Sequence, residues 1–291
     1  MDLHCAPIAF QKNGDINTCF NHSELKLLAN EFNKHSKKSS NNNKKIKVSQ
    51  TKDGLVQELK TAYREICNEN QFCWIEQHLS NSSKKEQLLQ KFRPIKPLSW
   101  YKNKNTWLNT YDIQYVLEQY QVLHKNFKFL GVQPIDFESR NSSNNCIGDD
   151  FCDFTVAKLK SLKKTQFAAV FNTDPSYKSG QHWISMYCNV NPKKTNYGIY
   201  FYDSVANDAP KEIRKFAQRI VKEMNDPKFK YHENRIQRQR SSYDCGVFSI
   251  VFITQCLKYI EFNEICERMH YDNYINSLRD ILYRPNLEAL N

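Results

Sequence analysis

The sequence predicts an α+β fold, in which a sheet of short strands is flanked by helices. Residues 166–172, 182–190 and 197–202 are short runs rich in aromatic and β-branched side chains, as expected of strands. Longer stretches before and after them carry apolar residues at helical spacing. The chain has 291 residues, 40% of them hydrophobic, which is enough for one sizeable core and a smaller second domain.

The first 93 residues predict a small helical domain. Helical patterns cover residues 23–35, 55–67 and 84–92. Between the first two lies a tract rich in Lys, Ser and Asn, residues 36–49, which we expect to be mobile. Pro94 and Pro97 interrupt the chain after the third helix, so we divide the protein into residues 1–93 and 94–291.

The second domain carries further helix and turn signals. Asn109 or Thr110 is expected to cap a helix over residues 112–120, and a proline lies near the start of another over residues 209–224. We expect a polar loop at 139–145, a short strand or turn at 235–240 and a closing helix at 271–282. Strands with helices around them give a packed α+β domain.

Cys245 is the first candidate for chemistry. A polar, turn-forming run precedes it and an abruptly apolar run follows it, which places it at the start of a buried helix. The unpaired N–H groups and the positive dipole end of a helix favour a thiolate over a thiol. Gly246 lets the backbone pack closely behind the sulfur, and the side-chain amide of Gln239 is placed to form half of an oxyanion hole. The alternative is a structural cysteine on a core helix.

A base and an orienting acid for this nucleophile lie upstream. His182 opens one predicted strand and Asp203 follows directly after the next, so antiparallel pairing would bring the two side chains together. A thiol nucleophile needs a base, and the base needs a group that holds its tautomer. Taken singly, His182 also suits a half-buried strand position and Asp203 the start of a turn. The prediction of a triad rests on Cys245, His182 and Asp203 together.

These residues resemble the cysteine proteases of clan CE. The likeness lies in the His–Trp pair at 182–183, the strand that ends in Asp203, and the Gln–x5–Cys–Gly element from Gln239 to Gly246. The clan includes the SUMO-specific (ubiquitin-like-protein) proteases, the adenovirus protease and the capsid-maturation proteases of large DNA viruses. Residues 171–183 and 239–241 are most similar to the African swine fever virus type of polyprotein-processing protease. That type carries Asn in the acid position, whereas this chain has Asp203, as SUMO proteases do.

The resemblance implies an adenain-like core, with a central mixed sheet flanked by helices, and a substrate tunnel. Trp107–Leu108–Asn109 is similar to a helix start of the SUMO proteases. In those enzymes this Trp and the Trp after the catalytic His form a tunnel that admits only glycine-glycine, because two close indole faces leave no room for a Cβ atom. Trp107 and Trp183 are the corresponding residues here. The alternative is that Trp107 is a hydrophobic staple at a helix start and Trp183 a core residue.

The function predicted from this resemblance is a cysteine endopeptidase that cleaves viral structural polyproteins after Gly-Gly during virion maturation. Its partner is a protein substrate, and its expected location is the virion and the host cytoplasm. One alternative is a protease that removes SUMO or another ubiquitin-like protein from its targets. A second alternative is a clan CE acetyltransferase that takes acetyl from coenzyme A, although such enzymes lack the Trp-Leu-Asn element. The oligomeric state stays open.

Composition limits the cofactors and partners. No apolar run reaches the roughly 18 residues of a membrane helix and no signal peptide opens the chain, so we expect neither membrane association nor secretion. Ten cysteines without a Cys-x-x-Cys pair predict no metal and no cofactor. We expect free thiols in a reducing compartment, with the pairs Cys67/Cys73 and Cys146/Cys152 incidental. A net charge of +11 suits either nucleic-acid binding through a basic surface, such as the lysines at 158–164, or a merely solvated surface.

Overall fold

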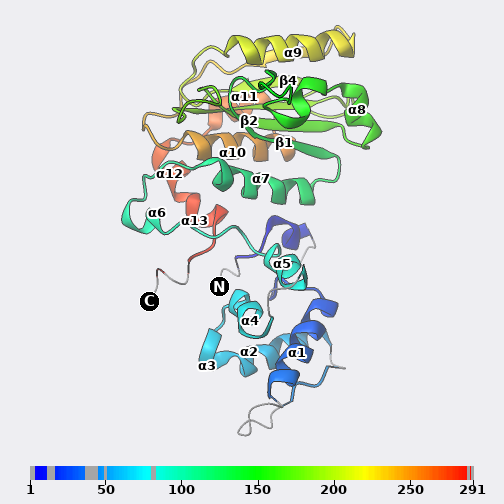
Figure 1. Cartoon of the computed structure of the whole chain (residues 1–291), viewed down its shortest axis with the longest axis vertical. Helices are drawn as coiled ribbons and strands as arrows, with labels where there is room; N and C mark the ends of the chain where they lie inside the picture. Colours follow the sequence, from blue (N-terminus) through cyan, green and yellow to red (C-terminus); the bar gives the residue numbers. More distant parts are fainter. Residues whose placement is uncertain are drawn as a thin grey trace. The chain divides into compact units, whose positions relative to one another are not determined.

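The computed structural model describes residues 4–11, 17–36, 45–48, 51–79, 83–286 and 289 (Figure 1). The chain divides into two units, Met1–Ile95 and Lys96–Asn291. Most of the 36–49 tract predicted to be mobile lies outside the described residues. Within its described part, Ile46 is buried and its backbone N–H donates to the side chain of Asn33.

The first unit is helical, as its sequence indicates. Its elements are η1 (Pro7–Gln11), α1 (His22–Ser36), α2 (Lys52–Ala62), α3 (Arg64–Cys67), α4 (Gln71–His78) and α5 (Ser83–Leu89). The single helix predicted over 55–67 is two, because the backbone leaves the helical conformation at Tyr63. Helix α4 was not predicted. The buried ring of Tyr63 stacks on Trp74 with 5.8 Å between ring centroids, at the centre of the core of this unit.

The expectation of free thiols is wrong for six of the ten cysteines. Disulfides join Cys5 to Cys19, Cys67 to Cys73 and Cys146 to Cys152. The last two are the pairs interpreted as incidental. Their loops fold back so that the Cα atoms are 5.5 and 5.9 Å apart, within the usual range for a disulfide. The spacing of cysteines along the chain cannot show that their Cα atoms come this close. Because six cysteines are paired, free thiols no longer support the inference of a reducing compartment.

The second unit is built on a five-stranded mixed sheet with the strand order β1-β2-β3-β4-β5. The strands are β1 (Phe127–Gln133), β2 (Gln166–Asn172), β3 (Trp183–Asn189), β4 (Gly198–Tyr202) and β5 (Lys230–Glu233). The two outer pairs are parallel and the inner pairs β2–β3 and β3–β4 are antiparallel. This confirms the predicted α+β class and the mixed sheet that the resemblance implied.

Helices cover both faces of this sheet (Figure 1). Their bounds are α6 (Ser99–Lys102), α7 (Thr110–Leu123), η2 (Asp149–Asp153), α8 (Val156–Ser161), α9 (Lys211–Met224), α10 (Cys245–Leu257), α11 (Phe262–Arg268), α12 (Asp272–Ser277) and α13 (Arg279–Leu282). Helices α7 and α10 pack on one face, and α8 and α9 on the other. Successive strand residues point to opposite faces, so Phe167 belongs to the α9 core and Ala168 to the α10 core.

The predicted strands are the buried ones. Strands β2, β3 and β4 lie in the middle of the sheet, and their continuous apolar runs are buried on both faces. The edge strands were missed: β5 has only four residues, and β1 is interrupted by Lys128 and by Gly131, where its pairing with β2 shifts. Residues 235–240 form no strand, and the closing helix breaks into α12 and α13 at Leu278.

Candidate active site

The antiparallel pair β3 and β4 brings His182 and Asp203 together. His182 directly precedes β3 and Asp203 directly follows β4, so the two residues meet at one end of the sheet. His182 Nε2 lies 2.7 Å from Asp203 Oδ1, a hydrogen-bond distance. The His182 side chain is 19% exposed and that of Asp203 only 3%. A buried carboxylate bonded to one ring nitrogen fixes the tautomer and leaves Nδ1 as the reactive nitrogen.

Asn234, a residue that the sequence did not single out, holds Asp203 in place. Asn234 Oδ1 accepts the Asp203 backbone N–H at 2.8 Å, and Asn234 Nδ2 donates to the Asp203 carbonyl at 2.9 Å. The Val205 N–H donates to Asp203 Oδ1 at 3.0 Å. Asn234 is 1% exposed, so these bonds are shielded from water. Its position depends on the turn after β5, which has no local sequence signal.

Cys245 is the first residue of α10, where the sequence placed the start of a buried helix. The residue is 2% exposed. A Cβ atom on Gly246 would lie 3.0 Å from Leu108 Cβ and 3.3 Å from Trp183 Cδ1, closer than nearly all real contacts. The absence of a side chain at Gly246 therefore allows the two cleft segments, at 107–109 and 182–183, to pack against the start of α10.

The His182 imidazole interacts with the Cys245 thiol as well as with Asp203. Burial of the ring by itself lowers its pKa, but the hydrogen bonds to Asp203 and Cys245, and their negative charges, outweigh burial and raise the pKa to about 9. A pKa raised in this way favours the protonated ring, the imidazolium. A cation at this position stabilises a thiolate and holds a proton that a leaving amine can take.

This pKa gives the first prediction, for the pH dependence of catalysis. Because the proton on His182 is lost as the pH rises through about 9, kcat/KM should fall on the alkaline side in that range. In Asp203→Asn the hydrogen bond to a full negative charge is gone, so the alkaline limb should move to lower pH. A pH profile of kcat/KM for both proteins measures this. An alkaline limb that stays in place in the variant would show that Asp203 does not set the protonation of His182.

Gln239 lies in the loop that leads to Cys245, and its side chain is bonded at both ends. Its Oε1 accepts a hydrogen bond from Ser204 Oγ at 2.5 Å, and its Nε2 donates to the Ser241 carbonyl at 2.7 Å. The residue is 2% exposed. An amide NH₂ has two donor hydrogens, and the second one remains for the oxyanion role that we predict.

The second prediction tests this role of Gln239. Gln239→Glu replaces the donor by an acceptor of nearly equal volume, and we expect kcat to fall by roughly 10²–10³. Gln239→Met is the companion variant, because it removes the donor without adding a charge. Steady-state kinetics on one peptide substrate, with unfolding midpoints as the check on folding, gives the answer. An unchanged kcat in both variants would remove Gln239 from the oxyanion hole.

A buried arginine, Arg279, forms hydrogen bonds to the loop residues that directly precede Cys245. Arg279 Nη2 donates to the Tyr243 carbonyl at 3.1 Å and to Asp244 Oδ1 at 3.2 Å, while Nη1 donates to the Thr106 carbonyl at 2.6 Å. Arg279 is 3% exposed and Asp244 fully buried. One guanidinium thus ties the residues before Cys245 to the residue before Trp107, which the sequence did not reveal.

A cavity of about 590 Å³ opens beside the triad. Trp107, Gly180 and Trp183 are among the residues in its wall. Trp183 is 7% exposed and its Nε1 donates to the Leu108 carbonyl at 2.8 Å, whereas Trp107 is 43% exposed. Asn109 caps α7 in a capping box with Asp112, so the position of a hydrophobic staple falls on Leu108. Trp107 is therefore a cavity residue and not the staple.

Among the described residues we find no group of metal-ligating side chains and no membrane-spanning helix. None of their His, Cys, Asp and Glu side chains gather in groups of three or more that could hold a metal ion. Within the same part of the chain, no helix has the length and apolar character needed to cross a membrane.

Comparisons with known proteins identify the clan to which the chain is similar. The sequence profile of the family described as YopJ Serine/Threonine acetyltransferase matches residues 137–290, which contain His182, Asp203 and Cys245 but not Trp107. A protein of Acanthamoeba polyphaga mimivirus, named as a thiol protease, is 28% identical over 96% of this chain and 93% of its own length. A cysteine protease of African swine fever virus is 21% identical over 63% of this chain and 70% of its own length.

A crystal structure of the African swine fever virus protease shares the fold. It superposes with a TM-score of 0.65 at 16% identity, covering 97% of this chain and 96% of that one. The chain therefore belongs to the family that the YopJ Serine/Threonine acetyltransferase profile describes, within clan CE, and it is a cysteine protease of the viral and SUMO-protease type.

Proposed function

We propose that this protease cleaves peptide bonds that follow a Gly-Gly pair, with Cys245 as nucleophile. The thiolate attacks the scissile carbonyl, and the imidazolium of His182 gives its proton to the leaving amine. Water then hydrolyses the acyl-enzyme, with His182 as base and Asp203 holding its tautomer. The observation that carries the proposal is the 2.7 Å contact between His182 and Asp203, next to a cysteine that begins a buried helix.

The preference for glycine is supported by the two indoles in one cavity. Trp107 and Trp183 both line the cleft beside the triad, and Trp183 is fixed by its bond to Leu108. If the two rings enclose the chain just before the scissile bond, a Cβ atom there would meet an indole face.

The third prediction follows for the substrate. Replacing either glycine of a good Gly-Gly substrate by alanine should lower kcat/KM by roughly 10- to 100-fold, because one added methyl group forces a steric clash in a rigid slot. The measurement is cleavage of the three peptides, with mass spectrometry to locate each cut. As a control, alanine placed after the scissile bond should be tolerated. Efficient cleavage of the Gly-Ala peptide would contradict the tunnel.

Acetyl transfer from coenzyme A is the competing activity, because the matching family profile carries that name. A transferase would use the same cysteine to hold an acetyl group. The wall formed by Trp107 lies outside the segment that the profile matches, which favours the protease. Incubation with acetyl coenzyme A and a peptide distinguishes the two, since a transferase adds an acetyl group to an intact peptide and a protease leaves two fragments.

The natural substrate that we propose is a viral structural polyprotein, cleaved during virion maturation in the particle and the host cytoplasm. The support is the two viral relatives, each named as a thiol or cysteine protease. Removal of a ubiquitin-like protein is the alternative, supported by African swine fever virus relatives that are named SUMO-1 cysteine proteases. Processing of a Gly-Gly polyprotein and of a SUMO precursor, compared side by side, separates the two substrates.

We also propose that the helical first unit recognises partners and that a basic surface holds the enzyme on nucleic acid. Lys125, Lys128 and Lys164 lie near one another: burial and then these two lysine charges lower the pKa of Lys164. A surface of this kind binds phosphates by counterion release. Duplex-DNA affinity should fall steeply between 50 and 200 mM salt, by roughly 10³-fold or more for six contacts. Changing Lys158, Lys160, Lys163 and Lys164 to Glu should abolish it.

A further inference from the structure

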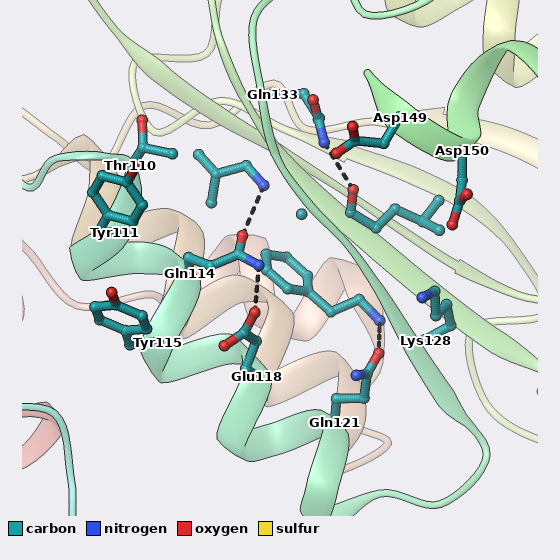
Figure 2. Close-up of a pocket in the computed structure, with 14 residues that line it drawn as sticks. Thr110, Tyr111, Gln114, Tyr115, Glu118, Gln121, Lys128, Gln133, Asp149 and Asp150 are labelled. Atoms are coloured by element: carbon teal, nitrogen blue, oxygen red, sulfur yellow. Dashed lines mark hydrogen bonds between the residues drawn. The ribbon is translucent and has the colours of Figure 1, made fainter. Parts of the chain in front are cut away.

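The cleft beside the triad does not end at the tryptophans. A second cavity, of about 530 Å³, shares Thr110, Val132 and Gln133 with the wall of the first. It is a groove between α7 and η2, with the edge strand β1 as its floor. Figure 2 shows Tyr111, Tyr115 and Glu118 on the α7 side and Asp149 and Asp150 on the other. A substrate chain that leaves the tunnel on this side would enter this groove.

The charge of the cleft and groove is opposite to that of the protein. The chain carries a net charge of +11, yet the two cavities are lined by four carboxylates and only two lysines. The carboxylates are those of Glu118, Asp149, Asp150 and Asp174, and the lysines are Lys128 and Lys178. Among the ion pairs formed by the described residues, none includes any of these four acids.

Asp174 is the strongest sign that the cleft receives a donor. It lines the first cavity, is only 9% exposed, and no described residue donates a hydrogen bond to its carboxylate. Its own backbone groups are used, since its N–H donates to Asn172 and its carbonyl accepts from Ile135. A carboxylate with which no described side chain pairs, on the wall of a cleft, can bind a cation or an N–H group of a substrate by a charge-assisted hydrogen bond.

The α7 wall adds an aromatic surface. Tyr111 and Tyr115 are 66% and 53% exposed, and their rings stack with 6.1 Å between centroids. Exposed tyrosine faces attract the cationic side chains of Lys and Arg. Strand addition is disfavoured here, because Gln121 accepts the N–H of Phe129 at 2.7 Å and Gln114 that of Val132 at 3.2 Å. These two side chains already bond to backbone N–H groups of β1 that an added strand would need. The groove is therefore expected to bind the side chains of a substrate and not its backbone.

From these observations we infer that the groove binds a basic segment of the substrate, rich in Lys or Arg, upstream of the cleaved bond. The inference rests on the proposed function, since it names the substrate class of the same site. Each exposed ion pair contributes roughly 1.4- to 5-fold in affinity, so three together give about tenfold. The effect is a gain in kcat/KM, and it weakens as salt screens the charges.

The test uses two fluorogenic peptides with the same Gly-Gly core and length. One carries three lysines or arginines five to ten residues before the cut, and the other carries glutamines at those positions. The readout is the ratio of the kcat/KM value of the basic peptide to that of the neutral peptide. A substitution that lowers activity on both peptides equally leaves this ratio unchanged. For the wild type we expect a ratio of about ten at low salt, falling towards one at high salt.

The variant that tests the groove is the triple change Glu118→Gln, Asp149→Asn and Asp150→Asn, and it should lower the ratio to about two, the share that Asp174 still supports. Asn suits position 149 because Asp149 has φ of 50°, a left-handed conformation that Asn also adopts. Asp174→Asn should lower the ratio on its own. The matched control removes three exposed carboxylates elsewhere, with Glu65→Gln, Glu69→Gln and Glu267→Gln, and should keep the wild-type ratio.

A wild-type ratio below two, or a ratio of ten that survives the triple change, would overturn the inference. Both results leave the proposed function intact, because the neutral peptide is still cut after Gly-Gly. If neither peptide is cut, the proposed function itself fails, and the inference fails with it.

Discussion

Cys245→Ala should abolish peptide cleavage and leave the fold intact. The side chain is small and stands at the first residue of α10, so its loss removes the sulfur without opening a large cavity. His182→Ala should cost nearly as much, because members of a triad act as a unit. Asp203→Ala should cost less, since the acid orients the base and does not react. Single-turnover rates for the three variants, with circular dichroism as the folding control, measure this.

The free cysteines provide the matched control for this prediction. Cys188, Cys256 and Cys266 are buried free thiols like Cys245, but they lie in the strands and helices of the core. Burial raises the pKa of each of these three thiols. Cys256→Ala should therefore retain most of the activity. Turnover that survives in Cys245→Ala, or is lost in Cys256→Ala without unfolding, contradicts the assignment of the nucleophile.

Arg279→Met should destabilise the protein by about 3–5 kcal/mol, because it leaves the buried carboxylate of Asp244 without a cation. That is a large part of the roughly 5–15 kcal/mol by which native domains are stable. The change also frees the carbonyls of Thr106 and Tyr243, which flank the Trp107 wall and the nucleophile. Denaturant unfolding gives the free energy, and kcat measured at low temperature shows whether the loosened loop slows the remaining folded enzyme.

Two further variants separate the contribution of the Arg279–Asp244 ion pair from that of the other hydrogen bonds of Arg279. Arg279→Lys keeps a cation but loses the fork that reaches three acceptors, so it should be destabilising to a smaller extent. Adding Asp244→Asn to Arg279→Met removes the unpaired charge and should recover part of the lost stability. If the single and double variants unfold with the same free energy, the buried ion pair is not what holds the loop.

The positions of the three proposed triad residues in the fold could be predicted, because each stands at a boundary that the sequence marks locally. His182 and Asp203 lie at the ends of buried strands with continuous apolar runs, and Cys245 stands where a polar run meets an apolar one. The contact between His182 and Asp203 depends only on antiparallel pairing of neighbouring strands. The cap of α7 was predicted for the same reason, as either Asn109 or Thr110; the structure shows that it is Asn109, in a capping box with Asp112.

The groups that support the site could not be predicted, because they come from distant parts of the chain. Asn234 and Arg279 contact the triad loops across separations of 31 to 36 residues, and Arg279 reaches the segment before Trp107 across 173 residues. Nothing in their neighbourhoods distinguishes them from surface polar residues. The edge strand β1 contains Lys128 and Gly131, and its apolar pattern is too weak to predict a strand. The groove that has this strand as its floor was therefore missed. The disulfides were misjudged because pairing depends on how the intervening loop closes.

The most direct test of the account is covalent labelling with a peptide that ends in Gly-Gly and carries an electrophile in place of the scissile carbonyl. Intact mass and digestion of the labelled protein locate the adduct, and a Gly-Ala probe and the Cys245→Ala variant serve as controls. We predict one adduct, on Cys245, that forms with the Gly-Gly probe, forms roughly 10- to 100-fold more slowly with the Gly-Ala probe, and is absent from the variant. Labelling of Cys188, Cys256 or Cys266 instead, or equal labelling by both probes, would contradict it.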